Sequence, residues 1–204
     1  MTFKTIIQSV LLYAAAITSQ AGFATDGKID FNESFNNQPW HKLNNEQAVN
    51  TLMEFAEMFV STLEQQHLKT FDDLDFNIFT NQKWHELGNS HAQDVIVHWP
   101  DGRTTVGIDV HIKDLESMFV YAPDTRIQEH PIRIADGRWT AVVGIMEGTF
   151  SKPMVTADGS VIEPTDKSYR IMMATVGRWE NGVMAEEWLF WDNQSFMQQI
   201  GLAD

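Results

Sequence analysis

Four consecutive segments in the second half of the chain constrain the fold most, because each is rich in β-branched and aromatic residues. They span residues 126–134, 138–151, 167–179 and 183–191. The turn signals between them are Asp136-Gly137, Asp158-Gly159 and Asn181-Gly182. Such dipeptides are typical of connections between antiparallel strands. The pattern therefore predicts an antiparallel meander of four strands.

Helical patterns fill the first half of the chain. Asn44 and Gln47 resemble a capping box, and a long amphipathic helix is expected to follow them. A shorter helix is expected within residues 70–90, and another between Gly107 and Pro123. A short strand is expected at 94–99 and a last helix at 195–200. Helices early and strands late indicate an α+β domain.

Glycines interrupt the two longest predicted strands, at Gly144, Gly148 and Gly177. Glycine inside a strand often marks a bend or a bulge. We therefore expect a cone-like barrel, in which a curved, mostly antiparallel sheet wraps around the N-terminal helices. The apolar interior of such a cone is a place where a small hydrophobic molecule binds.

The N-terminal residues have the pattern of a secretory signal peptide. Lys4 precedes an apolar run from Ile6 to Ile17, and small residues follow up to Ala24. The run is too short to span a membrane, so no membrane insertion is expected after cleavage. We expect a signal peptide at 1–24, an irregular arm at 25–43 and one domain at 44–204. The absence of cysteine from the sequence is compatible with a periplasmic or secreted protein that needs no disulfide.

The charge of the chain argues against a nucleic-acid partner. It has 28 acidic and 14 basic residues, which gives a formal net charge of −14. Such a surface repels nucleic acid and anionic lipid.

The last strand and its exit, residues 184–194, suggest a reaction pocket. Because alternate side chains of a strand share a face, these five are expected to point the same way: Met184, Glu186, Trp188, Phe190 and Asp192. A carboxyl group beside large apolar surface tends to have a raised pKa, which suits proton transfer.

Two of these carboxylates have alternative interpretations. Asp192 is either an acid in the pocket or the N-cap of the helix at 195–200. Glu186 either enters the pocket or pairs with Arg178 on the neighbouring strand.

Short motifs occur in an order that resembles the SnoaL-like polyketide cyclases. They are His98-Trp99-Pro100-Asp101-Gly102, Gly107, Pro123-Asp124, Asp136-Gly137, Glu147-Gly148-Thr149, Asn181-Gly182, Glu186-x-Trp188-x3-Asp192 and Gln199-Ile200-Gly201. The resemblance covers about residues 45–203. It implies the cone-shaped fold of nuclear transport factor two.

The resemblance also implies a chemistry. In such cyclases an aspartate near the end of the last strand is the general acid/base of an intramolecular aldol condensation, and Asp192 matches it. No metal or organic cofactor is implied. Family members often have histidine after Gly-Thr in the second long strand, where this chain has Phe150.

These considerations give a set of expected site residues. Asp192 and His98 are the expected catalytic residues. The expected pocket wall consists of Trp188, Glu186, Phe190, Trp99, Met146, Phe150 and Trp84. The histidines at 85, 91 and 111 match no metal-binding signature, so no metal site is expected.

Three functions remain open from the sequence. The protein is a cyclase, isomerase or hydrolase of a small hydrophobic molecule, a non-catalytic binding module for such a molecule, or an assembly domain. A homodimer is expected, because symmetric dimers are the commonest oligomers.

Overall fold

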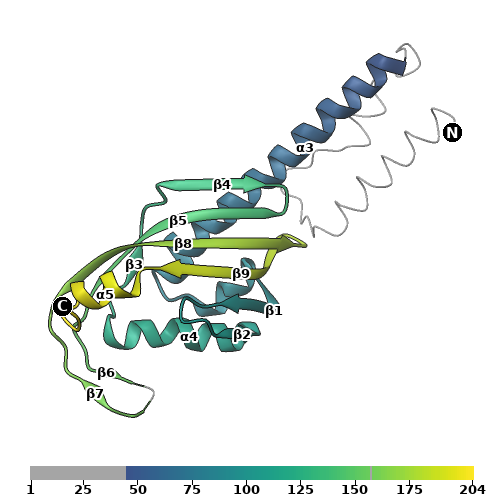
Figure 1. The fold of residues 1–204 in the computed structure, drawn as a ribbon. Coiled ribbons are helices and arrows are strands. Elements are labelled where there is room, and N and C mark those ends of the chain that lie inside the picture. Colours follow the sequence, from purple (N-terminus) through teal and green to yellow (C-terminus); the bar gives the residue numbers. More distant parts are fainter. Residues whose placement is uncertain (1–44, 157) are drawn as a thin grey trace. The chain divides into compact units, whose positions relative to one another are not determined.

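The computed structural model describes residues 45–156 and 158–204 (Figure 1). The predicted signal peptide at 1–24 and the predicted arm at 25–43 lie outside these residues. The chain divides into two compact units, Met1–Leu63 and Glu64–Asp204, and the second unit contains the sheet and the cavities. Among the described residues, no helix has the length and hydropathy that crossing a membrane requires.

The helical segments follow the expected order. The helices are α3 (Asn45–Asp73), the π-helix η2 (Leu74–Phe79), the 3₁₀ helix η3 (Trp84–Asn89), α4 (Ile108–Tyr121) and α5 (Asn193–Gln199). The stretch 70–90, where one shorter helix is predicted, is helical but holds the end of α3, the π-helix η2 and the 3₁₀ helix η3. Its apolar residues are irregularly spaced, and they do not form the regular stripe of an α-helix.

The strands form one mixed sheet and a small separate hairpin. The strands of the main sheet are β1 (His91–His98), β2 (Thr104–Val106), β3 (Arg126–Ile127), β4 (Ile132–Asp136), β5 (Trp139–Thr149), β8 (Ser168–Glu180) and β9 (Val183–Trp191). Their order is β2-β1-β9-β8-β5-β3, with β4 also paired to β5. Only β1 and β9 pair in parallel among these strands. β6 (Met154–Val155) and β7 (Val161–Ile162) form the hairpin.

The predicted α+β class and curved, mostly antiparallel sheet are confirmed. β4, β5, β8 and β9 form the expected meander, and Figure 1 shows the long strands β5 and β8 curving along their length. The first predicted strand, 126–134, is wrong in one respect, because it is broken into β3 and β4. Pro131 lies in the break, and proline has no N–H to donate to a sheet.

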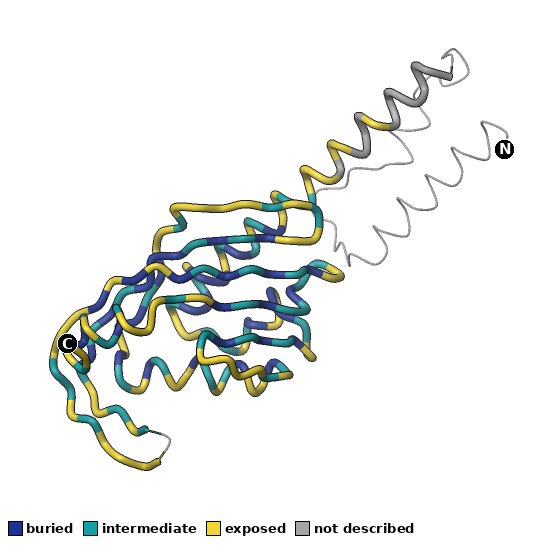
Figure 2. Tube along the Cα trace, viewed as in Figure 1, coloured by how far each residue is buried: buried dark blue, intermediate teal, exposed yellow. Residues whose placement is uncertain are grey.

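Residues along the strands alternate between buried and less buried (Figure 2), so one face of the sheet is buried and the other is partly exposed. In β8, the side chains of Tyr169, Ile171, Met173 and Thr175 are buried. The alternate residue Met172 is 65% exposed. We call these sides the inner and the outer face. Residues of η2, α4 and the last turn of α3 complete the core on the inner side.

A bulge at Ala185 reverses the alternation of β9. Arg178 pairs with Glu186 and Trp179 pairs with Met184, so Ala185 has no partner in β8. As a result, Met184 and Glu187 are both buried. The predicted inward face of 186, 188, 190 and 192 is therefore wrong, because one extra residue turns the side chains beyond it to the opposite face.

The interior glycines make room for neighbouring side chains. A Cβ at Gly148 would lie 2.8 Å from Oη of Tyr169, and one at Gly177 would lie 2.6 Å from Sδ of Met184. The close approach of the Tyr169 and Met184 side chains thus explains why these two positions are glycine.

Candidate functional site

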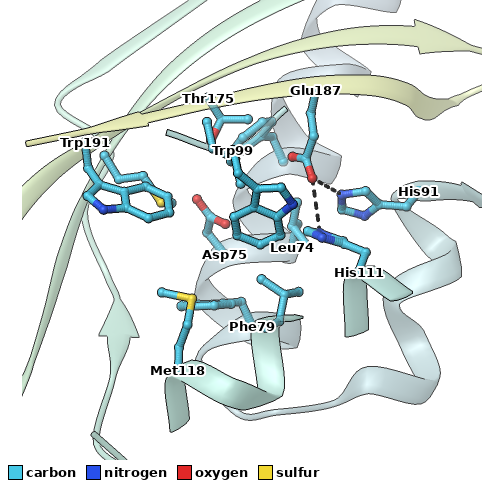
Figure 3. Close-up of a pocket in the computed structure, with 14 residues that line it drawn as sticks. Leu74, Asp75, Phe79, His91, Trp99, His111, Met118, Thr175, Glu187 and Trp191 are labelled. Atoms are coloured by element: carbon cyan, nitrogen blue, oxygen red, sulfur yellow. Dashed lines mark ion pairs between the residues drawn. The ribbon is translucent and has the colours of Figure 1, made fainter. Parts of the chain in front are cut away.

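The inner face of the sheet encloses a small cavity (Figure 3). Its volume is about 40 Å³. Its walls are mainly apolar and aromatic, and they consist of Phe71, Leu74, Asp75, Phe79, His91, Trp99, His111, Leu115, Met118, Met173, Thr175, Glu187, Leu189 and Trp191. Two acidic and two imidazole side chains therefore share a cavity with large apolar groups.

Asp75 is the first of these polar groups. Its side chain is 8% exposed, and Figure 3 shows its carboxyl group among the aromatic side chains that line the cavity. Nε2 of His130 lies 2.8 Å from its Oδ2. Burial raises the pKa of Asp75 above its usual value of 3.8, although the hydrogen bond with His130 acts in the opposite direction.

His130 connects Asp75 to a second carboxylate. Its Nδ1 lies 2.8 Å from Oδ1 of Asp72, whose side chain is 29% exposed and also binds Arg133 at 2.6 Å. Burial lowers the pKa of His130, but the hydrogen bonds and charges of the two aspartates outweigh it, so the pKa is raised overall. The three residues form a continuous chain from the cavity to the solvent.

Local structure explains how these groups meet. Asp75 lies on the π-helix η2, a rare geometry that is frequent at functional sites. The backbone N–H of Ile127 donates to Oγ1 of Thr80 at 2.9 Å, which fixes β3 beside the end of η2. His130 lies in the break between β3 and β4. A Cβ at Gly144 would lie 3.5 Å from the His130 ring, so glycine leaves space for the ring.

Glu187, His91 and His111 form the second polar group. Oε1 of Glu187 lies 3.6 Å from Nε2 of His91 and 3.1 Å from Nε2 of His111 (Figure 3). All three side chains are at least 96% buried. Burial lowers the pKa of His111 to about 4, so it is neutral at pH 7. One ligand atom from each residue lies within 4.8 Å of the others, close enough to hold a metal ion.

A larger hollow adjoins the inner cavity. Its volume is about 180 Å³, and Trp99, Met118 and Trp191 line both. The guanidinium of Arg103 lies 4.4 Å from the ring centroid of Trp99 and binds Asp114 at 2.8 Å. The outer hollow is therefore more polar than the inner cavity, and the two share part of their walls.

Asp192 lies outside both cavities. Its Oδ1 accepts the backbone N–H of Ser195 at 3.0 Å, and the residue is exposed. It is the N-cap of α5. Of the two interpretations of Asp192, the structure shows the helix cap.

Four other expected site residues also lie away from the cavities: His98, Glu186, Trp188 and Phe190. Nε2 of His98 lies 2.9 Å from Oε1 of Glu186, and its ring stacks on Trp188 with centroids 4.9 Å apart. Glu186 also accepts from Arg178 at 3.0 Å, which confirms the pairing alternative. Phe190 is 53% exposed. The expectation that these residues belong to a pocket is wrong, and for the three on β9 the bulge at Ala185 is the reason.

The other expected wall residues are divided between cavity and core. Trp99 lines both cavities, and Met146 lines the outer hollow. Phe150 is fully buried beside Tyr121. Trp84 packs edge to face against Phe79 and Phe119. Phe150 and Trp84 therefore support the cavity walls from behind.

The polar cavity residues were missed from the sequence. Glu187 follows Glu186, and two adjacent glutamates give no indication of which one faces inward. Asp75, His91 and His111 come from separate elements, so their sequence spacing carries no signal. Pro131 was the one available sign that His130 lies at a break in a strand.

Solved structures similar to this chain share its fold. IdmH from Streptomyces antibioticus has a TM-score of 0.57 and 20% identity, with 67% of this chain and 99% of that chain covered. A SnoaL-like protein from Jannaschia sp. CCS1 has a TM-score of 0.60 and 16% identity, with coverage of 70% and 96%. A protein from Xanthomonas campestris pv. campestris has a TM-score of 0.59 and 13% identity, with coverage of 68% and 99%. At these identities the likeness shows the fold alone.

The family comparison covers most of the sheet and its helices. No curated protein shows significant similarity to the chain. The model of the SnoaL-like polyketide cyclase family matches residues 74–200. This match includes η2, the main sheet, α4 and every residue that lines the two cavities except Phe71. The chain belongs to the family of SnoaL-like polyketide cyclases.

Proposed function

We propose that the protein binds a small hydrophobic molecule in its two adjoining cavities and converts it by proton transfer at Asp75. The reaction class is that of a cyclase, isomerase or hydrolase. The observation that carries the proposal is a buried carboxyl group in an aromatic cavity, connected through His130 to Asp72 near the surface. The family's description as polyketide cyclases supports an organic substrate.

The two contacts of His130 require a proton in each. Either the ring carries both protons, or it carries one and one of the two carboxyl groups is protonated. Asp75 is the more buried of the two, which favours the proton on Asp75. The second arrangement places a neutral carboxylic acid in the cavity. Because burial favours the neutral form, this acid is available to donate a proton to a carbonyl or another oxygen of the bound molecule.

The hydrogen-bonded row Asp75–His130–Asp72 also returns a proton to Asp75 after each reaction. The Asp72 side chain is partly exposed to solvent, whereas that of Asp75 is buried beside the cavity. His130 accepts a proton on one ring nitrogen and releases one from the other. Asp75 thereby regains its proton without any opening of the cavity.

The cavity volumes favour a small substrate. The volumes of about 40 Å³ and about 180 Å³ are below the roughly 300–1,000 Å³ of sites for drug-sized ligands. The reacting end would lie in the inner cavity beside Asp75. The remainder would pass between Trp99 and Trp191 into the outer hollow.

The test begins with the ligand. Native mass spectrometry of protein purified from its own source identifies a retained molecule, and that molecule and its close analogues are then assayed for conversion. Asp75→Asn should bind the molecule and lose about 100-fold to 10,000-fold in turnover. Asp192→Asn is the matched control, since asparagine keeps the helix cap, and it should retain turnover.

Two results would overturn the proposal. Turnover that survives Asp75→Asn removes this carboxyl group from the reaction. Retention of the molecule without conversion by the wild-type protein favours the non-catalytic binding module.

We also propose that the outer face of the sheet joins a second copy of this chain. Ile132, Val143, Ala174 and Phe190 are in register across four strands, and both Ile132 and Phe190 are about half exposed. Such an apolar face pairs with itself about a two-fold axis. Light scattering should give twice the chain mass for the wild type and the chain mass for Phe190→Asp. A monomeric wild-type protein would exclude the dimer.

Export remains a proposal, supported by the pattern of residues 1–24. After expression with the full leader in a Gram-negative host, the periplasmic protein should begin after Ala21 or Ala24. An intact Met1 on cytoplasmic protein would contradict it. The small-residue pattern at the cleavage site is the support for both positions.

A further inference from the structure

Three buried side chains converge at one end of the inner cavity from three different elements. His91 begins β1, His111 lies in the first turn of α4 and Glu187 lies in β9. Close contact among them is not explained by hydrogen bonds. Among the described residues, Nε2 of His91 and Oε1 of Glu187 are buried and have no hydrogen-bond partner.

The distances between these atoms match the edges of a metal coordination tetrahedron. Metal bonds of about 2.0–2.1 Å to nitrogen and oxygen give edges of about 3.4 Å. Oε1 of Glu187 lies 3.1 Å from Nε2 of His111 and 3.6 Å from Nε2 of His91. The third pair of ligand atoms also lies within 4.8 Å. The three atoms are thus close enough together for one ion to bind all of them.

The hydrogen bonding of His91 leaves its Nε2 free to bind a cation. Oγ of Ser90 donates to the carbonyl of Leu87 at 3.1 Å and lies 2.9 Å from Nδ1 of His91. A hydroxyl has one proton, so Ser90 must accept from Nδ1. Nε2 is then the free ring nitrogen of His91, and it faces Oε1 of Glu187 at 3.6 Å. A cation between these two atoms would bind both.

The surroundings of His111 fit the same arrangement. Nδ1 of His111 and Oδ2 of Asp114, three residues further along α4, are both buried without a hydrogen-bond partner among the described residues. Metal-bound histidines usually donate their other ring N–H to a carboxylate, directly or through water. Asp114 lies one helical turn from His111 and its charge acts on that imidazole, while its Oδ1 is held by Arg103.

We propose that His91, His111 and Glu187 bind one divalent transition-metal ion, with zinc as the best match. Two imidazoles and one carboxylate are a known ligand set for zinc, and magnesium and calcium prefer oxygen ligands. All three residues line the inner cavity, so the fourth coordination position faces it. An ion there polarises an oxygen atom of a molecule in the cavity.

This inference goes beyond the proposed function and uses different residues. Asp75 is not one of the three ligands, so Asp75→Asn should remove turnover and keep the metal. Loss of the metal site alone would leave the hydrogen bonds from Asp75 through His130 to Asp72 in place.

The test measures binding of zinc to tag-free protein after treatment with a chelator. Elemental analysis and titration calorimetry should give one zinc ion per chain. Affinity should fall at least about 100-fold in His111→Ala and in Glu187→Gln, as expected for loss of a direct ligand. His98→Ala is the matched control, because His98 forms a similar pair with Glu186 on the same two strands but faces outward. It should bind zinc as the wild type does.

Other results overturn the inference. A wild-type protein without stoichiometric zinc binding would exclude the site, and so would full binding by His111→Ala and Glu187→Gln. If a variant does not fold, X-ray absorption of the zinc-loaded wild type should show two imidazole ligands. A site with one imidazole or none would place the ion elsewhere.

Discussion

Nε2 of His130 lies 2.8 Å from Oδ2 of Asp75, which joins an imidazole at the break between β3 and β4 to the carboxyl group in the inner cavity. Gly144 on β5 leaves the space in which they meet. The pair therefore depends on three distant parts of the chain. Its function and its stability can be tested separately.

The first prediction concerns the pH dependence of stability. The aspartates on either side raise the pKa of His130 despite the opposing effect of burial. Its contribution to stability is therefore fully present below its unfolded pKa of 6.5 and is lost as the pH rises through the raised folded value. His130→Asn should lower the free energy of unfolding by about 3 kcal/mol at low pH.

The measurement is urea unfolding of the wild type and His130→Asn from about pH 5 to about pH 9. The difference between the two proteins should become smaller as the pH rises. A difference that grows with pH would show that Asp75, His130 and Asp72 do not together hold an extra proton in the folded protein.

The second prediction concerns Asp192 as a helix cap. Asp192→Ala removes the acceptor for the N–H of Ser195 and should lower the free energy of unfolding by about 1 kcal/mol. Asp192→Asn keeps an acceptor and should change it by only a few tenths of a kcal/mol. Chemical denaturation followed by circular dichroism compares them. Equal losses in both variants would mean that the negative charge, and not the cap, matters.

The third prediction concerns Gly148. A Cβ there would lie 2.8 Å from Oη of Tyr169, a hydroxyl that forms a buried hydrogen bond of 2.7 Å with Thr125. Gly148→Ala should therefore cost about 1–3 kcal/mol through overpacking. Gly88→Ala is the control, since its nearest neighbour would be 3.8 Å away. Thermal unfolding that is equal for both variants would contradict this explanation of the glycine.

The fold was predictable because its signals are local. Turn dipeptides and β-rich segments give the meander, and the limits predicted for the last strand, Val183 and Trp191, are those observed. The break at Pro131 and the π-helix at Asp75 were not predicted. Both depend on how β3 and η2 pack together, which a window of sequence does not contain.

The site was less predictable than the fold, for a specific reason. A single extra residue, Ala185, turns Glu187 inward and Glu186 outward. Alternation counted along the sequence cannot detect such a bulge, because nothing in the residue types requires it. The same residue explains why Trp188 stacks on His98 on the outer face.

The most direct test of the account is the titration of the Asp75 carboxyl group. Its ¹³C resonance, assigned by its loss in Asp75→Asn, should report a pKa above 3.8 because the group is buried. The hydrogen bond with His130 lowers that pKa, so His130→Asn should raise it further. A pKa at or below 3.8 that does not respond to His130→Asn would contradict Asp75 as the proton-transferring group of the cavity.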